Sequence, residues 1–446
     1  MSQNNKLDRR SFIKTSLAGA AGTTALLGTG LSAQNETGTG QAPKITGYRT
    51  LGRTGFKVSD IGLGTGIQTN ANVFAAAFEM GVNYVDTGEH YSRGASERAT
   101  GEALKTWDRK KIFVTTKLNL LFLGEQKATK EGLKERFAKC LGRLQTDYVD
   151  CLMIHMTSTA DQVKHEGFHA AARELKAEGR IRFIGLSNHG PEQRIYGNTK
   201  EPMEKVLMAA VEDGRFDVAL FVYNFLQKEQ GEKIIRACRE KDMGVTLMKT
   251  NPVNVYKRWK TGVDQTVARG RKPSDATVKM DEEYQAYLKA AEVFKRKYGL
   301  ESEGEIRDAA IKFCLSNDGV HSVCPSIGSF EELETLVKLS GQKLTTAEAP
   351  LLAGYGDTLG RFYCRHACGA CETACPHAVP VNTIMRYNHY FEAQGREKYA
   401  MAKYAEMPRS KADRCGGCSG VCESLCPHGV PVRSLLAAAH DNLTLV

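Results

Sequence analysis

Eight short runs of β-branched and apolar residues, separated by amphipathic stretches, constrain the fold of this chain most strongly. The runs are Ile61–Gly64, Val82–Thr87, Ile112–Lys117, Tyr148–His155, Ile181–Asn188, Val218–Asn224, Val245–Lys249 and Ser322–Ile327. Strands that alternate with helices predict a parallel sheet with helices outside it, and eight such strands close into a barrel. We therefore predict an α/β fold, with a (β/α)8 TIM barrel over residues 47–345.

Polar residues stand where several of these strands run out into the following loops. They are Asp86, Tyr91 shortly after it, Lys117, His155, Ser187 and Asn188. A closed ring gathers its strand ends at one mouth, which is where barrels of this kind carry their chemistry. Singly, each side chain has a structural explanation, such as a packed tyrosine or a core histidine. Together, at the ends of successive strands, they favour catalysis.

The sequence resembles the aldo-keto reductase family over roughly two thirds of its length, the size of a full barrel. The motifs are Leu51-Gly52-Arg53-Thr54-Gly55, Gly62-Leu63-Gly64-Thr65, Asp86-Thr87-Gly88-Glu89-His90-Tyr91, Ser96-Glu97 and Gly185-Leu186-Ser187-Asn188. The resemblance implies a carbonyl reductase with a catalytic tetrad of Asp86, Tyr91, Lys117 and His155. It also implies cofactor contacts at Gly64, Thr65, Asp86, Ser187, Asn188, Ser326, Gly328 and Ser329.

The residue types of this tetrad suit hydride transfer to a carbonyl. The developing alkoxide needs a proton donor, and a free phenol, with a pKa of about 10, is a reluctant one near neutrality. A neighbouring ammonium, Lys117, lowers the pKa of the Tyr91 phenol, and Asp86 holds that lysine in place. An imidazole at His155 can hydrogen-bond the substrate oxygen.

Two positions depart from the family pattern. Leu220 stands where a glutamine commonly supports the nicotinamide, and Leu336 stands where an asparagine usually meets adenine. The segment Cys324–Ser329 resembles the one that holds the adenosine phosphate, but no cation follows it directly. A 2′-phosphate is normally gripped by cationic side chains. The implied cofactor is therefore NADP(H) or NAD(H), with the choice open.

A long insertion after the seventh strand, between Pro252 and Glu305, is rich in cations. They are Lys257, Arg258, Lys260, Arg269, Arg271 and Lys272. Two explanations are open, a basic lid over an anionic cofactor or substrate and a solvated charged loop.

Eight of the 13 cysteines cluster near the C-terminus, in two groups that each end in Cys-Pro-His. The groups are Cys364, Cys368, Cys371 and Cys375, then Cys415, Cys418, Cys422 and Cys426. The repeat is offset by 426 − 375 = 51 residues. The spacing resembles the bacterial ferredoxin run, in which three thiolates serve one cubane cluster and a fourth serves its partner. We predict a small helical ferredoxin-like module over residues 355–440 with two [4Fe–4S] clusters, or one cluster with spare thiols.

The spacing leaves the ligand assignment open. The first group has three, two and three intervening residues and the second has two, three and three, where ferredoxins have two, two and three. Structural zinc sites and disulfides are competing explanations of such pairs. The Cys-Pro endings favour iron.

The N-terminus resembles a twin-arginine export signal over residues 1–33. Paired arginines, Arg9 and Arg10, precede an apolar stretch from Thr15 to Leu31, and Ala33 is a plausible last residue before cleavage. A polar linker follows over residues 34–46. We expect a periplasmic protein exported in the folded state, without a membrane span unless the signal is retained as an anchor. This route typically carries proteins already folded around cofactors, which agrees with the cysteine groups.

The overall charge indicates no nucleic-acid partner. Of the net +10, the N-terminal Lys6, Arg9, Arg10 and Lys14 against Asp8 supply 4 − 1 = +3, and the rest is spread along the chain. Three functions stay open. In the first, nicotinamide-dependent conversion of a small carbonyl or alcohol substrate is combined with clusters that brace the barrel or serve a redox partner protein. The second is a one-electron path from the clusters to the barrel mouth, and the third is a non-catalytic electron-carrier or binding scaffold.

Overall fold

The computed structural model describes residues 42–120, 128–190, 201–253, 262–268, 270, 272–302, 304–392, 396–407 and 410–444. The predicted signal peptide and most of the predicted linker lie outside these residues. No described helix is long and apolar enough to cross a membrane.

Eight parallel strands follow one another around a sheet, in the order of the sequence. They are β3 (Leu63–Gly64), β4 (Tyr84–Asp86), β5 (Phe113–Leu118), β6 (Val149–Ile154), β7 (Ile181–Asn188), β8 (Val218–Val222), β9 (Gly244–Met248) and β10 (Ser322–Val323). Parallel bridges join the first strand region to the last at Ile61 with Val323 and at Gly64 with Ser326. Each predicted run contains a strand, and these bridges supply the contact between first and last strands that a barrel requires.

A small antiparallel hairpin, β1 (Tyr48–Thr50) and β2 (Lys57–Ser59), precedes the barrel. Its buried Leu51 packs against the start of β9, where a Cβ on Gly244 would come within 2.7 Å of the leucine Cδ1. The hairpin therefore lies at the end of the barrel where the strands begin. The opposite end, where the strands finish, carries the predicted site.

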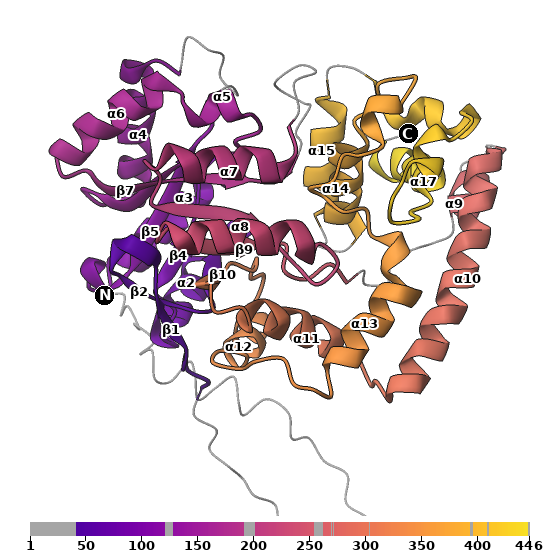
Figure 1. Ribbon diagram of the computed structural model, residues 1–446, viewed down its shortest axis with the longest axis horizontal. Helices are drawn as coiled ribbons and strands as arrows, with labels where there is room; N and C mark the ends of the chain where they lie inside the picture. Colours follow the sequence, from indigo (N-terminus) through magenta and orange to yellow (C-terminus); the bar gives the residue numbers. More distant parts are fainter. Residues whose placement is uncertain are drawn as a thin grey trace, which may run out of the picture. The chain divides into compact units, whose positions relative to one another are not determined.

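Helices from the strand connections surround the sheet (Figure 1). They are α2 (Ala71–Glu79), α3 (Ala95–Leu104), α4 (Lys130–Leu144), α5 (Ala160–Val163), α6 (Glu166–Ala177), α7 (Met203–Asp213), α8 (Lys228–Glu240), α11 (Gly304–Leu315) and α12 (Phe330–Val337). Side-chain caps begin several of them. The Thr129 hydroxyl accepts a hydrogen bond from the Gly132 backbone N–H, and Ser329 accepts one from Glu332.

The C-terminal segment consists of short helices around a hydrophobic core of its own. Its helices are α13 (Ala349–Thr358), α14 (Val381–Glu392), α15 (Glu397–Ala405), α16 (Val421–Ser424) and α17 (Val432–Leu443). The 3-10 turns η6 (Gly360–Phe362), η7 (Glu372–Ala374) and η8 (Ala412–Gly417) connect them. The barrel and this segment thus have distinct hydrophobic cores.

The insertion after β9 contains the helices α9 (Gly262–Ala268) and α10 (Asp275–Tyr298). Residues at helical spacing along α10, among them Tyr284, Tyr287 and Phe294, are buried in the core of the C-terminal segment. Figure 1 shows α10 beside α13 and α17. This part of the insertion is therefore neither a lid nor a solvated loop, because an apolar stripe docks it. Of the six cations named above, Lys272 is exposed and the other five lie outside the described residues.

Candidate active site

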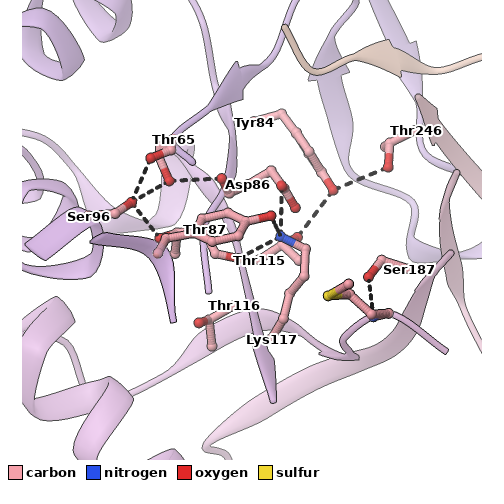
Figure 2. A network of polar contacts seen from close by, with 12 residues as sticks. Thr65, Tyr84, Asp86, Thr87, Ser96, Thr115, Thr116, Lys117, Ser187 and Thr246 are labelled. Carbon is pink, nitrogen blue, oxygen red and sulfur yellow. Dashed lines mark hydrogen bonds and ion pairs between the residues drawn. The ribbon is translucent and has the colours of Figure 1, made fainter. Parts of the chain in front are cut away.

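The Lys117 ammonium is the centre of a buried polar network at the ends of β4 and β5. It donates to Asp86 Oδ2 at 2.7 Å and to the Thr87 carbonyl oxygen at 2.7 Å (Figure 2). It also donates to the Tyr91 hydroxyl at 3.2 Å. Lys117 is fully buried, and the parallel register places Asp86 beside Thr115 of the neighbouring strand. Three of the four predicted catalytic residues therefore meet through direct bonds.

His155 completes the predicted tetrad from the next strand. It follows the last residue of β6, and its backbone N–H donates to the Leu118 carbonyl at 2.8 Å. Its ring centre lies 5.5 Å from that of Tyr91, with the rings nearly perpendicular at 78°. The structure thus brings together all four residues that the sequence places at three successive strand ends.

Burial governs the protonation of these groups. It raises the pKa of the Tyr91 phenol, and the nearby Asp86 adds to the rise, while the Lys117 ammonium acts in the opposite direction. The sequence predicts a lowered phenol pKa from Lys117, but enclosure of the hydroxyl outweighs that cation. Burial acts to lower the pKa of Lys117, yet Asp86 and Tyr91 outweigh it and the pKa is raised. At neutral pH the lysine is charged and the tyrosine keeps its proton.

The pKa of His155 shifts in the opposite direction, downward. Burial, followed by the positive charge of Lys117, lowers its pKa well below the usual value. The imidazole is therefore neutral near pH 7 and can share a hydrogen bond with an oxygen without contributing a charge.

A second buried ion pair fixes the loop between Asp86 and Tyr91. The Glu89 carboxylate accepts bonds from the Arg136 guanidinium, with the Nε at 3.1 Å, and from the Asn119 backbone N–H at 3.0 Å. Burial acts to raise the pKa of Glu89, but His90 and Arg136 hold it at about 2. This pair was not expected from the sequence. The position of Arg136 indicates only an ordinary helix residue, and its role depends on the packing of α4 on the loop.

A cleft of about 990 Å³ opens over the tetrad. This lies at the upper end of the range of about 300–1,000 Å³ for small-molecule sites. Of the predicted cofactor residues, Gly64, Asp86, Ser326 and Gly328 line it. Gly64 has to lack a side chain, since a Cβ would come within 2.7 Å of the Pro325 carbonyl oxygen. Leu220 and Leu336, the two departures from the family pattern, also line the cleft.

The other predicted cofactor residues are not in the cleft wall; they bond to neighbouring groups instead. They are Thr65, whose hydroxyl donates to the Asp86 carbonyl at 2.9 Å, Ser187, Asn188 and Ser329. The Ser187 hydroxyl accepts from the Met156 backbone N–H at 3.0 Å, and the Asn188 amide donates to the Thr157 carbonyl at 2.7 Å. In this structure these side chains shape the strand ends, and their contact with a cofactor remains a prediction.

The C-terminal segment supplies the rest of the cleft wall. Arg386, Tyr387, His389 and Tyr390 come from α14, Arg396 caps the start of α15, and Tyr399 lies on α15. The Arg396 guanidinium reaches the Gly66 carbonyl oxygen of the barrel at 3.5 Å. No sequence pattern indicates this wall, because it depends on how the segment docks over the mouth.

The eight clustered cysteines gather in two mixed sets. Burial raises the pKa of Cys364, and the thiols of Cys371, Cys368 and Cys426 add to the rise. Burial likewise raises the pKa of Cys415 to about 12, with contributions from Cys422, Cys375 and Cys418. Each set thus combines three cysteines of one sequence group with the last cysteine of the other, and Cys422 of the second set also raises the pKa of Cys371 in the first.

A small hollow is lined by the second of these sets. Its walls include Cys375, Cys415, Cys418 and Cys422. All 13 cysteines are free thiols, so no disulfide joins them in this structure. Among the described residues, no three Cys, His, Asp or Glu side chains lie close enough together to hold one metal ion.

The family is decided by a sequence profile. The profile of the Aldo/keto reductase family matches residues 62–354, which is most of the described barrel and α13. This chain belongs to the aldo/keto reductase family. The family consists of oxidoreductases, and its match ends before the first clustered cysteine.

Several known proteins are similar in sequence to this aldo/keto reductase. The NADH-specific methylglyoxal reductase of Escherichia coli is 24% identical over 348 residues, covering 70% of this chain and 98% of that protein. Probable aldo-keto reductase 1 of Glycine max is 28% identical over 210 residues, or 44% of this chain and 56% of the relative. An uncharacterised oxidoreductase of Bacillus subtilis is 33% identical over 152 residues, or 32% and 49%. The chain therefore spans only about half the length of the latter two relatives.

Two solved structures of aldo-keto reductases have low similarity to this chain. The holo form of an aldo-keto reductase from Bacillus halodurans has a TM-score of 0.49 at 23% identity, covering 70% of this chain and 96% of that one. An aldo/keto reductase of Klebsiella pneumoniae in complex with NADP and acetate has a TM-score of 0.45 at 18% identity, covering 68% and 93%.

Proposed function

We propose that the barrel interconverts a small carbonyl compound and its alcohol, with Tyr91 moving the proton. The observation that carries this proposal is the Lys117 ammonium, bonded at once to Asp86 and to the Tyr91 hydroxyl beneath the cleft. In carbonyl reduction the protonated phenol donates to the oxygen as negative charge develops there. The fixed positive charge of Lys117 then stabilises the phenolate that is left, without rearrangement.

His155 is proposed to hold the reacting oxygen. Its neutral ring lines the same cleft as the Tyr91 ring, at a centre-to-centre distance of 5.5 Å. A neutral imidazole can donate one hydrogen bond to that oxygen while the phenol donates the proton. The two groups would thus fix both the position and the orientation of the substrate.

The residues present fit a nicotinamide cofactor in part. The size of the cleft and the close approach of backbone at Gly64, Ser326 and Gly328 suit a dinucleotide, whereas Leu220 and Leu336 offer no polar contact. When bound, such a cofactor supplies or accepts the hydride. The relatives named above include one NADH-specific enzyme and one complex with NADP, so both cofactors are tested below.

We further propose that the two cysteine sets hold two [4Fe–4S] clusters. Cys364, Cys368, Cys371 and Cys426 would hold one, and Cys375, Cys415, Cys418 and Cys422 the other. In a cubane cluster each thiolate binds a different iron, so the four sulfurs lie further apart than around a single ion. Two sets of four thiols would supply the eight ligands that two such clusters need.

An observation favours the second candidate function, in which electrons pass singly between a cluster and the barrel mouth. The His155 ring centre lies 6.0 Å from that of His189, and the next residue, Gly190, contacts the His366 backbone. His366 lies between two ligands of the first cysteine set and packs on His389 at 5.1 Å. These ring and backbone contacts connect Tyr91 with the cysteine segment, and such a path would shorten each electron-transfer step.

The cysteine sets and the N-terminal motif are also the basis for proposing a redox partner and a cellular location. A cluster that exchanges single electrons needs an external donor or acceptor, so we propose a redox partner protein. The twin-arginine motif at Arg9 and Arg10 supports export of the folded protein to the periplasm. This location offers no obvious nicotinamide pool, which also favours the second candidate.

Anaerobic purification of the full chain, followed by iron and sulfide analysis and titration with NADPH and NADH, tests these proposals. We expect about eight irons per chain and a broad visible absorbance that bleaches on reduction. Bleaching by a nicotinamide would support the first function, and bleaching only by a one-electron donor the second. Zinc in place of iron would overturn the cluster assignment, and unchanged activity of Tyr91→Phe towards every substrate would favour the scaffold.

A further inference from the structure

The turn that directly follows Tyr91 has a strained backbone. Ser92 and Arg93 have φ values of 48° and 55°, in the left-handed region that residues other than glycine rarely adopt, and Gly94 follows with a φ of 83°. Left-handed residues normally occur singly, because the Cβ then lies too close to the following carbonyl oxygen. Such conformations persist only where the surrounding structure enforces them, and they cluster at active sites. Contacts from other elements must therefore hold this turn.

One ion pair anchors the chain directly before the turn. The Glu89 carboxylate is bonded to the Arg136 guanidinium of α4 and to the Asn119 backbone N–H just beyond β5. The same guanidinium donates to the Asn119 carbonyl oxygen at 2.6 Å, and the Glu89 backbone N–H donates to the Lys117 carbonyl oxygen at 3.2 Å. Glu89 is thus held between α4 and β5, the strand that carries Lys117.

A second ion pair anchors the chain after the turn. Glu97 on α3 is fully buried, and it accepts a bond from the Arg143 Nε of α4 at 2.6 Å and one from the Thr116 hydroxyl of β5 at 2.5 Å. The Arg143 side chain also packs on the turn itself, where a Cβ on Gly94 would come within 2.7 Å of its Cδ. Arg136 and Arg143 are seven residues apart, so they project from one face of α4. This face therefore holds both ends of the left-handed run.

The two anchors determine the route of the chain around Tyr91. Its hydroxyl lies 3.2 Å from the Lys117 ammonium, and its backbone lies between Glu89 and the left-handed run. If Ser92 and Arg93 relaxed to the right-handed region, the chain between the anchors would follow another path and the phenol would move. Catalysis is sensitive to such shifts, since a displacement of about 1 Å can cost about 10²-fold in rate.

We propose that two ion pairs on α4 are positioning groups for the proton transfer at Tyr91. They are Glu89 with Arg136 and Glu97 with Arg143. The pairs hold the turn in its left-handed conformation and so keep the phenol bonded to Lys117. Neither arginine belongs to the described wall of the cleft, so both act through Tyr91. This inference rests on the proposed carbonyl chemistry and deepens it by naming the groups that place the proton donor.

An apolar replacement of the first pair tests this role in the cluster-loaded full chain. Glu89→Leu combined with Arg136→Met leaves no buried charge, and such replacements are often neutral for stability. With benzaldehyde as substrate we expect kcat to fall about 10–100-fold and KM to change less than about twofold, because the pair affects the transition state and not substrate binding. An unchanged kcat would overturn the proposal, as would a loss that lies in KM alone.

A glycine in the turn distinguishes positioning from overall stability. Ser92→Gly in the same background should restore kcat about fivefold, because glycine adopts the left-handed conformation readily and avoids the cost borne by another residue. Gln145→Gly is the matched control, since Gln145 is exposed and has a φ of 53° at the end of α4. This control should relieve a similar strain and leave kcat unchanged. Equal recovery in both variants would overturn the positioning role.

Hydrogen exchange measured by mass spectrometry adds a readout that needs no turnover. In the pair variant we expect amide exchange over residues 88–97 to rise about tenfold and exchange in β8, four strands away from β4, to stay unchanged. Ser92→Gly should reverse the rise. An equal rise in both segments, or none in the turn, would overturn the proposal. Failure of the proposed function has a different signature, in which the unsubstituted enzyme converts no aldehyde while the local rise persists.

Discussion

At the barrel mouth, Lys117 is fully buried and bonded to three neighbours, whereas five of the eight clustered cysteines remain partly exposed on short turns and loop ends. The mouth is held by strands whose ladders exist without any ligand. The cysteine segment has short helices and 3-10 turns, which gain little from local hydrogen bonding. The tetrad is thus preorganised by the fold, whereas we expect the cysteine segment to depend in part on the clusters proposed for its thiols.

The largest expected effect concerns the preorganised region. Tyr91→Phe should lower kcat by about 10²–10⁴-fold, because it removes a positioned proton donor. Steady-state kinetics with a small aromatic aldehyde measures this change. Tyr48→Phe is the control, since that ring is 45% exposed and its hydroxyl donates only to the Gly81 carbonyl at 2.8 Å. A similar loss in both variants would mean that the effect is structural.

A second substitution tests how much the polar network at the barrel mouth stabilises the fold. Lys117→Met should lower the free energy of unfolding by about 3–5 kcal/mol, because Asp86 is left buried without its partner. Urea unfolding followed by circular dichroism gives the value. Lys105→Met, which breaks an exposed pair with Glu102, should cost less than about 1 kcal/mol. Equal costs would show that the tetrad network does not stabilise the barrel.

Substitution of single cysteines tests the cysteine segment. Cys426→Ser should halve the iron content, from about eight to about four per chain, because it removes one ligand from one of two cubane clusters. Iron analysis after anaerobic purification measures the loss. The circular dichroism of the barrel strands should persist if the two regions differ as described.

Double substitutions decide between mixed and unmixed sets. In the mixed arrangement, Cys364→Ser combined with Cys426→Ser should leave about four irons, and Cys415→Ser combined with Cys426→Ser should leave none. The reverse pattern would contradict the mixed assignment and place each sequence group on its own cluster.

The smallest expected effect is on how the free energy of unfolding depends on pH. Burial lowers the pKa of His389 to about 4, so the unfolded chain takes up a proton on this residue below about pH 6.5 while the folded chain does not. Stability is therefore lost as the pH falls from about 6.5 towards 4. His389→Phe should reduce this slope by at most about 1.4 kcal/mol per pH unit, as measured by urea unfolding at several pH values. An unchanged slope would contradict the assignment.

Much of the barrel could be predicted from sequence because its signals are local. Each of the eight runs, such as Ile181–Asn188, contains a strand, with ends that differ by a few residues. The four tetrad residues meet because parallel strands deliver their carboxyl ends to one edge. Lys117 lowers the pKa of Tyr91 as predicted, but burial of the hydroxyl outweighs it and the net pKa is raised, since that enclosure depends on packing that no spacing reveals.

The sequence by itself determined the eight strands, the tetrad positions and the existence of two cysteine groups, because periodicity and motif spacing are properties of neighbouring residues. Tertiary structure alone decided which thiols share a set, that α10 docks on the C-terminal core, and that Lys249 and Arg386 line one cleft. These features join residues that are 40 positions apart (Cys375 and Cys415) to 137 positions apart (Lys249 and Arg386) or orient side chains across a fold. Only the packing of separate elements brings such groups together, so no local pattern encodes them.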